Sequence, residues 1–548
     1  MLYSSSRWRV TDEGEGPRQA HLLTSAGACL SFSSARVRQD RGKAVERHQP
    51  AEGSVPDSTR RNSAPKTLMA RRGGWWLLPV LALLFDLVVG GWFVTFGNGA
   101  FLSDKNQIFP FFFDAQADAL LKGELNVPCD VIGVEAYIVN EKCYGYFGIT
   151  PSLFRIPLNL AWPGYRGQWA PLSMFAATLV FLFVAFRLID KVRSALFANC
   201  PQDFQFHFLS AVYLLALGLG STSIFLLSRP VMYHEAIVWS VSLALAAMSL
   251  LFDYVVSGSV RWLFCAGVLA MLSVNTRPTG GAAAIGACGL IPLLALLLEW
   301  RRLSGSASLS VKMRDALIGA GLATLSLGVY LAVVHGKFGR FEVMPVRYNA
   351  VYTPERLARI DGSMLHLGNI RWNLRNYFGF TVFPFKQGWS QVAKVMREDP
   401  GAKVDGIEPY MSITVSMSAL LILAIMGTLG SSRTKHFRWG FDALCACALF
   451  GPVVMLTFAY LSYRYFHEYL LWFAIAGAAG IPAITTRLKA KGFLIPLVTL
   501  AVIVNAFLNT EMAILYQMNN TNVGRAISDV SERVHRWKEV VRTVFSAP

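Results

Sequence analysis

The stretch SDKNQIFPFFFDAQADALLKG, residues 103–123, follows the first long apolar segment and decides how the rest of the chain is arranged. It is polar at both ends and carries Asp104, Asp114 and Asp118. Asp114 and Asp118 are four residues apart, which places them on one face of a helix. Because the stretch lies between two apolar spans, it must sit at the mouth of a membrane domain. A carboxylate there can serve as a general base, or it can be an ordinary solvated charge.

The composition indicates a membrane protein. Of the 548 residues, 54% are hydrophobic and 16% are charged, against about 25% charged in typical soluble proteins. Apolar runs long enough to cross a bilayer recur along most of the chain. The net charge of +17 is explained by basic loops on one side of a membrane, so we expect membrane lipid and no nucleic acid as partners.

We predict an all-α membrane protein with about eleven transmembrane helices. The expected spans are residues 75–97, 169–189, 207–228, 233–256, 261–275, 279–300, 315–335, 411–430, 440–461, 465–484 and 492–509. With this count, five basic clusters fall on one side, which the positive-inside rule makes cytoplasmic. These clusters are Arg71/Arg72, Lys191/Arg193, Arg301/Arg302/Lys312/Arg314, Arg433/Lys435/Arg438 and Arg487/Lys489/Lys491.

Three regions follow from this topology. Residues 1–68 are rich in Ser, Arg and Gly and lack an apolar run, so they are expected to be disordered, as a cytoplasmic tail or the product of a mis-called start. Residues 69–510 form the membrane domain, with large outward loops at 98–168 and 336–410. Residues 511–548 form an outward tail with a short amphipathic helix, so the N-terminus is cytoplasmic and the C-terminus outside.

The two outward loops are too long to be simple connectors. In the first, residues 108–122 have helical spacing, and we expect this helix on the outer membrane face with phenylalanines 109 and 111–113 toward lipid. Cys129 and Cys143 share this loop, which leaves a disulfide open. In the second, aromatic residues alternate with arginines, typical of an interfacial belt or of a surface for saccharide and pyrophosphate.

Ionisable residues also stand at the outward ends of several spans, where exposure to lipid would be costly. They form candidate turns at 228–235, 275–280 and 463–469. Cations here could hold a leaving phosphate while a carboxylate takes a proton, or the same residues could be helix-end anchors and ion pairs between helices. The candidate substrate-binding residues are Lys105, Arg155, Arg229, Tyr233, Glu235, Arg277, Arg347, Arg464, Tyr465 and Glu468.

Short motifs resemble the GT-C superfamily of polytopic glycosyltransferases that use polyprenyl-phosphate-linked sugars. The segment AQADALLKGELNVP at 115–128 resembles the helix after the catalytic acid in such enzymes, and YGYFGITPSLFRIP at 144–157 resembles a stretch of bacterial relatives. Tyr233-His234-Glu235-Ala236 and Arg464-Tyr465-Phe466-His467-Glu468 resemble two further outer-end motifs. The likeness in architecture spans about 75–510.

The resemblance implies a catalytic aspartate in the first outer loop. Asp104 lies closest to the first span, as the superfamily's base does, and Asp114 is the second candidate. Protein mannosyltransferases of the superfamily carry an Asp-Glu pair there, whereas this chain has Asp104-Lys105. This departure leaves open both the catalytic residue and a requirement for a divalent cation. No metal-binding residues are assigned.

The favoured interpretation is an inverting glycosyltransferase acting at the outer membrane face, and the expected location is a bacterial inner membrane. Its partners would be a polyprenyl-phosphate-linked sugar and a glycan, lipid or protein acceptor. A transporter or flippase of a lipid-linked or anionic solute is the alternative, and broken helices at mid-membrane would favour it. A non-catalytic assembly scaffold is the third interpretation.

Overall fold

The computed structural model describes residues 74–103, 107–301, 306–383, 401–431, 437–487 and 491–518. Within these ranges, eight helical segments are long and apolar enough to cross a membrane, by length and composition. They contain α1 (Leu77–Val94), α5 (Ala170–Leu196), α8 (Met232–Ser257), α10 (Pro278–Arg301), α11 (Ser306–Phe338), α17 (Arg438–Ala448) with α18 (Phe450–Leu456), α19 (Leu470–Arg487) and α20 (Lys491–Met518). Three shorter apolar helices are α6 (Phe204–Gly218), α9 (Val260–Val274) and α16 (Ser418–Ser431).

The remaining elements are short and join these helices. The 3-10 helices are η1 (Gly74–Trp76), η2 (Gly133–Glu135), η3 (Pro163–Tyr165), η4 (Val346–Tyr348) and η6 (Tyr463–Tyr469). The short α-helices are α2 (Phe112–Leu121), α3 (Cys129–Ile132), α4 (Thr150–Ala161), α7 (Thr222–Leu227), α12 (Pro354–Arg359), α13 (Asn369–Phe378) and α15 (Ile413–Ser416). The strands are β1 (Tyr137–Val139), β2 (Lys142–Tyr144), β3 (Val382–Phe383), β4 (Gly406–Ile407), β5 (Tyr410–Met411) and β6 (Tyr460–Leu461).

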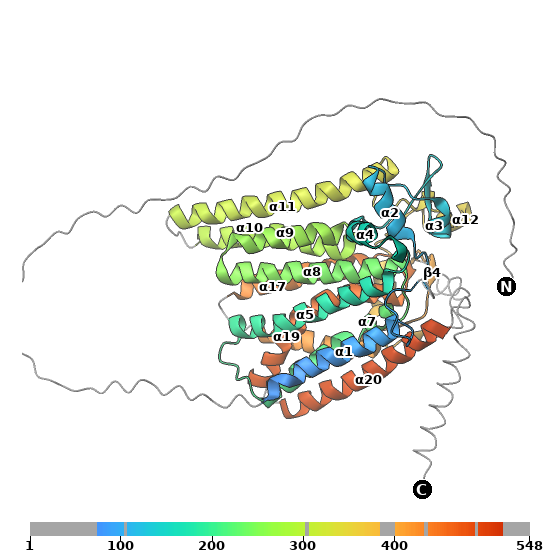
Figure 1. The fold of residues 1–548 in the computed structure, drawn as a ribbon. Helices are drawn as coiled ribbons and strands as arrows, with labels where there is room; N and C mark the ends of the chain where they lie inside the picture. Colours follow the sequence, from blue (N-terminus) through green and yellow to red (C-terminus); the bar gives the residue numbers. More distant parts are fainter. Residues whose placement is uncertain are drawn as a thin grey trace, which may run out of the picture. The chain divides into compact units, whose positions relative to one another are not determined.

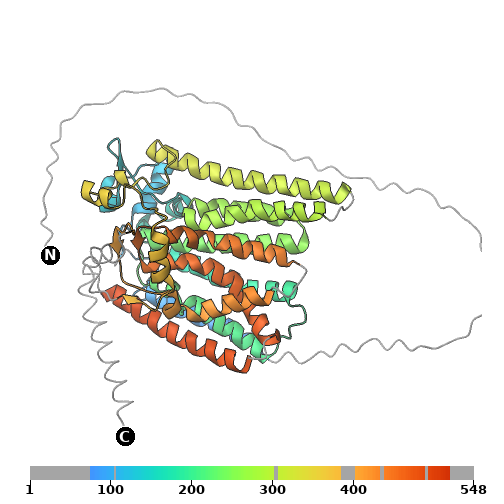
Figure 2. The same ribbon diagram turned by 180° about the vertical axis from the view of Figure 1, so that it is seen from behind.

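The prediction of an all-α membrane protein is confirmed, and each predicted span contains an apolar helix. The exact count of eleven spans stays a prediction, because three of these helices are short. The long helices run side by side, and the short elements of the outer loops gather at one end of them (Figure 1). The same arrangement is seen from behind in Figure 2.

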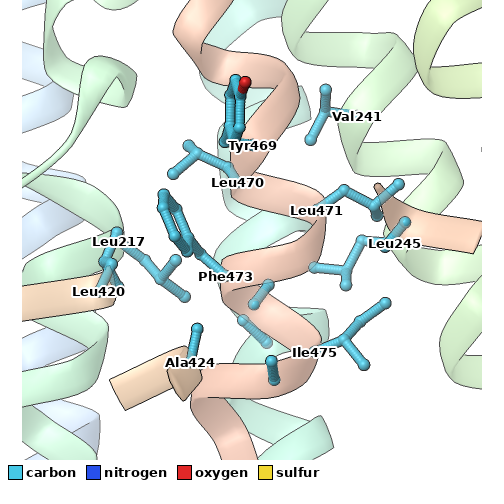
Figure 3. Packing of buried hydrophobic residues seen from close by; sticks show 14 of the residues in the cluster. Leu217, Val241, Leu245, Leu420, Ala424, Tyr469, Leu470, Leu471, Phe473 and Ile475 are labelled. Carbon is cyan, nitrogen blue, oxygen red and sulfur yellow. The ribbon is translucent and has the colours of Figure 1, made fainter. Parts of the chain in front are cut away.

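The helix α19 forms the centre of the apolar core. Its side chains pack against Leu217 of α6, Leu420 and Ala424 of α16, and Val241 and Leu245 of α8 (Figure 3). In the most apolar stretch of each span, 83% of the residues of α8 and 89% of those in the span that contains α19 are buried. The corresponding fraction is 22% in α11 and in α20. The first pair of helices is therefore interior, and the second pair offers its apolar side chains to lipid.

Glycines allow α16 and α19 to approach closely. A Cβ atom on Gly427 would lie 1.8 Å from the carbonyl oxygen of Ala476, and one on Gly480 would lie 2.2 Å from that of Leu423. Small residues at such crossings are the usual way for membrane helices to gain van der Waals contact, since lipid and side chains are equally apolar.

The predicted span 207–228 is interrupted, as is the span 440–461 between α17 and α18. Helix α6 ends at Gly218 and α7 begins at Thr222, so residues 219–221 interrupt the expected span 207–228. The Ser221 side chain caps α7 by accepting the Ser223 amide at 3.1 Å. Gly220 and Ser221 weaken the helix at this point.

The first outer loop packs on the protein rather than on lipid. Phe112 and Phe113 of α2 are buried in a cluster with Phe147 and Met232, so the expectation that they face lipid is wrong. Cys129 and Cys143 form a disulfide, with Cα atoms 5.2 Å apart. The disulfide joins α3 to the antiparallel hairpin β1–β2, which closes this loop on itself.

The second outer loop is anchored through two small sheets. Strand β3 pairs antiparallel with β5, and β4 pairs parallel with β6, in the register Gly406 to Tyr460. The second pairing brings residues 406–408 beside the start of η6, where the Glu408 amide donates to the Leu461 carbonyl at 2.8 Å.

Candidate functional site

Charged side chains from several separate segments meet at the end of the helices where the outer loops gather. They come from α2, α4, the first turn of α8, the turn between α9 and α10, the β4–β5 connection and η6. Two clusters can be distinguished, one around Asp114 and one around Tyr465.

The Asp114 cluster consists of Asp114, Arg155, Glu235 and Ser173. Arg155 donates to Glu235, with Nη2 and Oε1 2.6 Å apart, and its Nε lies 4.0 Å from Asp114 Oδ1. Ser173 Oγ donates to Glu235 Oε1 at 2.5 Å. The Gly167 amide donates to Asp114 Oδ2 at 2.9 Å. At most 8% of each of these four cluster residues is exposed, so the cluster is closed to solvent.

Burial raises the pKa of the Asp114 carboxyl above its ordinary value of 3.8. The Arg155 guanidinium, the Gly167 amide and the Asn159 side chain act in the opposite direction without overcoming this effect. The Arg155–Glu235 ion pair therefore lies beside an acid that gains a proton more readily than a surface aspartate.

The Tyr465 cluster consists of Tyr465, Arg277, Glu468, Arg464 and Glu408. The guanidinium carbons of Arg277 and Arg464 lie 5.4 and 5.1 Å from the centre of the Tyr465 ring. Arg277 Nε is 3.0 Å from Glu468 Oε1, and Arg464 Nη1 is 2.7 Å from Glu408 Oε2. Two guanidinium groups therefore meet at one aromatic ring, each beside its own carboxylate.

The Tyr465 cluster is more open than the Asp114 cluster. The side chain of Arg464 is 13% exposed and that of Glu408 is 31% exposed. Tyr233, on the first turn of α8, lies with its ring centre 4.7 Å from the Arg464 guanidinium. Since Glu235 on the same turn contacts Arg155, this turn of α8 connects the two clusters.

The first outer loop is held against the Tyr465 cluster from two sides. The amide of Gly148 donates to the Thr276 carbonyl at 3.2 Å, and a Cβ there would lie 1.7 Å from the Asn275 oxygen, so only glycine fits. Lys337, at the end of α11, donates to the carbonyls of Gly145 and Phe147 at 3.0 and 2.5 Å. These contacts fix the backbone on both sides of Tyr146.

Tyr146 and Glu135 extend the Tyr465 cluster toward the first loop. Burial raises the pKa of the Tyr146 hydroxyl, while the nearby Arg277 guanidinium lowers it. Burial also raises the pKa of Glu135, which lies within the field of Arg464 and of the Glu408 carboxylate.

The predicted site residues fall into four groups. Asp104 and Lys105 lie outside the described residues. Their flanks are anchored, because the Ser103 amide donates to the Gln168 carbonyl at 3.4 Å and the Ile108 amide to the Pro230 carbonyl at 3.3 Å. Asp114, Arg155 and Glu235 form one cluster, and Tyr233, Arg277, Arg464, Tyr465 and Glu468 belong to the other.

Arg229 and Arg347 belong to neither cluster. Arg347 is paired with Glu342 and exposed, and its guanidinium carbon lies 5.3 Å from the Tyr348 ring. Arg229 is buried after α7, with its guanidinium 5.7 Å from the Tyr516 ring.

Sequence reasoning missed Glu408, Glu135, Ser173 and Lys337. Glu408 stands just before the predicted span 411–430, so the rule that found Arg277 and Arg464 could have found it as well. Lys337 could not be found in this way, because a lysine at the end of a span normally extends to the interface. Among the described residues, no group of three or more His, Cys, Asp or Glu side chains could hold a metal ion.

No protein-family model and no curated protein sequence matches the chain. Among solved structures, it is similar to the archaeal oligosaccharyltransferase AglB from Archaeoglobus fulgidus in complex with an inhibitory peptide and a dolichol-phosphate. The TM-score is 0.44 at 12% identity, covering 81% of this chain and 56% of that one.

Two further structures of the Archaeoglobus fulgidus oligosaccharyltransferase are similar to a comparable degree. The apo form gives a TM-score of 0.43 at 11% identity, covering 79% of this chain and 55% of that one. The form tethered to an acceptor peptide with the NVT sequon gives a TM-score of 0.41 at 13% identity. The match covers 84% of this chain and 59% of that one. The chain matches little more than half the length of these structures, and the scores are too low for conclusions about activity.

Proposed function

We propose that the chain is an integral-membrane glycosyltransferase that moves a sugar from a polyprenyl-phosphate donor to an acceptor hydroxyl at the outer membrane face. The observation that carries the proposal is the meeting of Arg277 and Arg464 at the Tyr465 ring. Transfer from a lipid phosphate requires cations near the leaving phosphate and an aromatic surface near the sugar. The outer-end motifs that resemble GT-C enzymes contain two of these three residues.

The proposed reaction is a single displacement. Asp104 removes the proton of the acceptor hydroxyl as its oxygen attacks the anomeric carbon, and the bond from that carbon to the phosphate oxygen breaks. The electron pair of that bond leaves with the polyprenyl phosphate, whose charge the outer-end arginines stabilise. One displacement inverts the anomeric centre. The second outer loop, residues 336–410, would cover the sugar and exclude water.

The closed Asp114 cluster favours Asp104 over Asp114 as the base. The Asp114 carboxylate is 3% exposed and is held by the Gly167 amide, so an acceptor hydroxyl reaches it only if the cluster opens. We therefore keep Asp114 as the second candidate.

The test is the transfer of radiolabelled sugar from polyprenyl-phosphate donors to membrane lipids and proteins, comparing wild type with Asp104→Asn. We expect label to move in the wild type and to stop in the variant, while expression and unfolding stay the same. Asp130→Asn is the matched control, because Asp130 is an exposed aspartate of the same loop. Full activity of Asp104→Asn would reject Asp104 and direct the same test to Asp114.

A transporter or flippase of a lipid-linked solute is a second candidate, favoured by the broken span α6–α7. Asp86, in the middle of α1, is 4% exposed and packs against Gly218 at this break, where a Cβ would lie 2.3 Å from its Cγ. Interrupted helices beside an intramembrane acid are typical of transporters. Movement of a lipid-linked sugar across vesicles that stops in Asp86→Leu and continues in Asp104→Asn would establish this alternative.

A further inference from the structure

Arg229 differs in its charge balance from the other buried and partly buried arginines of the outer end. Those at 155, 277, 356 and 464 each have a carboxylate oxygen within 3.0 Å, from Glu235, Glu468, Asp405 and Glu408. Arg229 is 6% exposed. Within the described part of the chain, no Asp or Glu oxygen lies within 4.0 Å of its guanidinium, and its buried Nε has no acceptor.

Arg229 is not needed to cap the end of α7. The carbonyls at this helix end have other partners, since Ser228 Oγ donates to the Phe225 carbonyl at 2.7 Å. Gln517 Nε2 donates to the Ser228 carbonyl at 2.7 Å, and His234 Nδ1 lies 3.2 Å from the Leu226 carbonyl. The guanidinium instead lies beside the Tyr516 ring. A helix-end role therefore leaves its charge unexplained.

A buried guanidinium without a counter-charge is costly, and an anion that matches its planar donors removes this cost. Phosphate fits, because its oxygens accept two parallel N–H donors from one arginine. Paired arginines such as Arg155 attract a phosphate less, since a carboxylate already neutralises each of them.

The surroundings of Arg229 indicate that the phosphate is attached to a lipid. The site lies where α1, α7 and α20 end together (Figure 1), and Gln517 Nε2 also donates to the Phe93 carbonyl of α1 at 3.1 Å. Both α1 and α20 expose large apolar side chains along their length, among them Val88 at 70% and Phe507 at 65%. A lipid tail could lie against these side chains with its head at Arg229.

We propose that Arg229 binds the phosphate of a lipid-linked ligand through its unneutralised guanidinium, beside Tyr516 and the broken span α6–α7. This inference rests on the proposed function for the identity of the ligand, a polyprenyl phosphate. It adds Arg229 to Arg277 and Arg464 as a contact of the phosphate, and it favours Arg229 over Arg155 and Arg347.

The test is the binding of a radiolabelled short-chain isoprenyl phosphate to the purified full-length protein in detergent. We expect Arg229→Gln to weaken binding at least about tenfold, the loss of a charge-assisted hydrogen bond. Arg166→Gln is the matched control, since Arg166 is an exposed arginine at the same end, paired with Asp118. Binding by Arg229→Gln equal to that of wild type overturns the proposal.

Two competitors identify the part of the ligand that is recognised. Inorganic phosphate is expected to displace the probe only at a concentration about a hundredfold higher, because it lacks the apolar tail. Equal displacement would overturn the lipid assignment. Isoprenol, which carries the tail without the phosphate, is expected to bind weakly and equally to the wild type and to Arg229→Gln. An affinity of the wild type for isoprenol equal to that for isoprenyl phosphate would overturn the phosphate contact.

If Arg229→Gln does not fold, Arg229→Lys serves instead, because it keeps the charge and loses the planar pair of donors. We expect Arg229→Lys to lower the affinity for the isoprenyl phosphate severalfold, and an unchanged affinity overturns the proposal. Binding that depends on Arg229 in a protein that transfers no sugar would leave this inference standing and reject the proposed function. Sugar transfer together with probe binding that does not depend on Arg229 would support the proposed function and reject this inference.

Discussion

The Asp114 cluster and the Tyr465 cluster are built from the same residue types, and they differ in what their charges can reach. Arg155 is 3% exposed and is held between Glu235 and Asp114. Arg464 has a side chain 13% exposed, and it faces aromatic rings as well as Glu408. A charge enclosed by its partners stabilises the arrangement of helices, whereas a partly exposed charge can still interact with a ligand.

The connections of the two clusters agree with this difference. The Asp114 cluster joins α2, α4, α5 and α8, and the Gly167 amide adds the turn before α5. The Tyr465 cluster lies where both outer loops meet the helix ends, through Tyr146 on one side and Glu408 on the other. We therefore expect fold stability to depend mainly on the first cluster, and we propose ligand recognition for the second.

The largest effect is expected from Arg155→Met. Removing one partner of a buried ion pair leaves Glu235 charged and unpaired, which costs about 3–5 kcal/mol in the free energy of unfolding. Unfolding in mixed micelles, followed by circular dichroism, measures this loss. Arg166→Met removes an exposed pair with Asp118 and is expected to cost about 1 kcal/mol or less. Equal costs for the two variants would contradict the assignment of stability to the Asp114 cluster.

A smaller effect, on the rate of sugar transfer and not on stability, is expected from Arg464→Gln. Removing a positioned cation from the leaving phosphate is expected to lower the rate of sugar transfer about a hundredfold, or about 2.7 kcal/mol. Stability should change little, because Glu408 is partly exposed and can be solvated. The rate of label transfer and the unfolding midpoint are measured on the same preparation. A loss of stability as large as that of Arg155→Met would remove the distinction between the clusters.

The sequence predicted the candidate site residues better than it predicted the contacts between them. Apolar length was enough to place the helices, because it follows from the thickness of a membrane. Ionisable residues at outer ends identified Arg155, Glu235, Arg277 and Arg464. The pairing of Arg155 with Glu235, eighty residues apart along the chain, depends on how α4 packs against α8, and no local pattern encodes it.

Other features escaped the sequence for identifiable reasons. The aromatic residues Phe112 and Phe113 suit a lipid interface and a protein core equally well, and only the position of Phe147 decides between them. The break at residues 219–221 lies beside Gly218 and the run Ser221-Thr222-Ser223, and a mean hydropathy over the whole span averages these residues out. Glu408 is brought to Arg464 by the parallel pair β4–β6, whose strands have two residues each and leave little trace in the sequence.

The smallest effect is expected from Asp114→Asn, and it depends on pH. Because burial raises the pKa of Asp114 in the folded protein, the protonated acid stabilises the fold relative to the ionised one. Below the ordinary value of 3.8, the acid is protonated in both the folded and unfolded states, and wild type and variant should be equally stable. As the pH rises through the folded pKa, the wild type loses this stability, whereas the variant, which resembles the neutral acid, does not. The unfolding free energy of the variant should therefore exceed that of the wild type at neutral pH, by less than either of the two effects above.

Unfolding curves of both proteins between pH 4 and pH 8, with Asp118→Asn as the exposed control, measure this difference. A variant less stable than the wild type at neutral pH would mean that Asp114 is ionised and that its attraction to Arg155 outweighs the cost of burial. In that case Arg155 would be shared between two carboxylates, and the Asp114 cluster would carry a net negative charge. A variant more stable than the wild type at neutral pH would instead mean that Asp114 is neutral and that Arg155 and Glu235 form a balanced pair within the closed cluster.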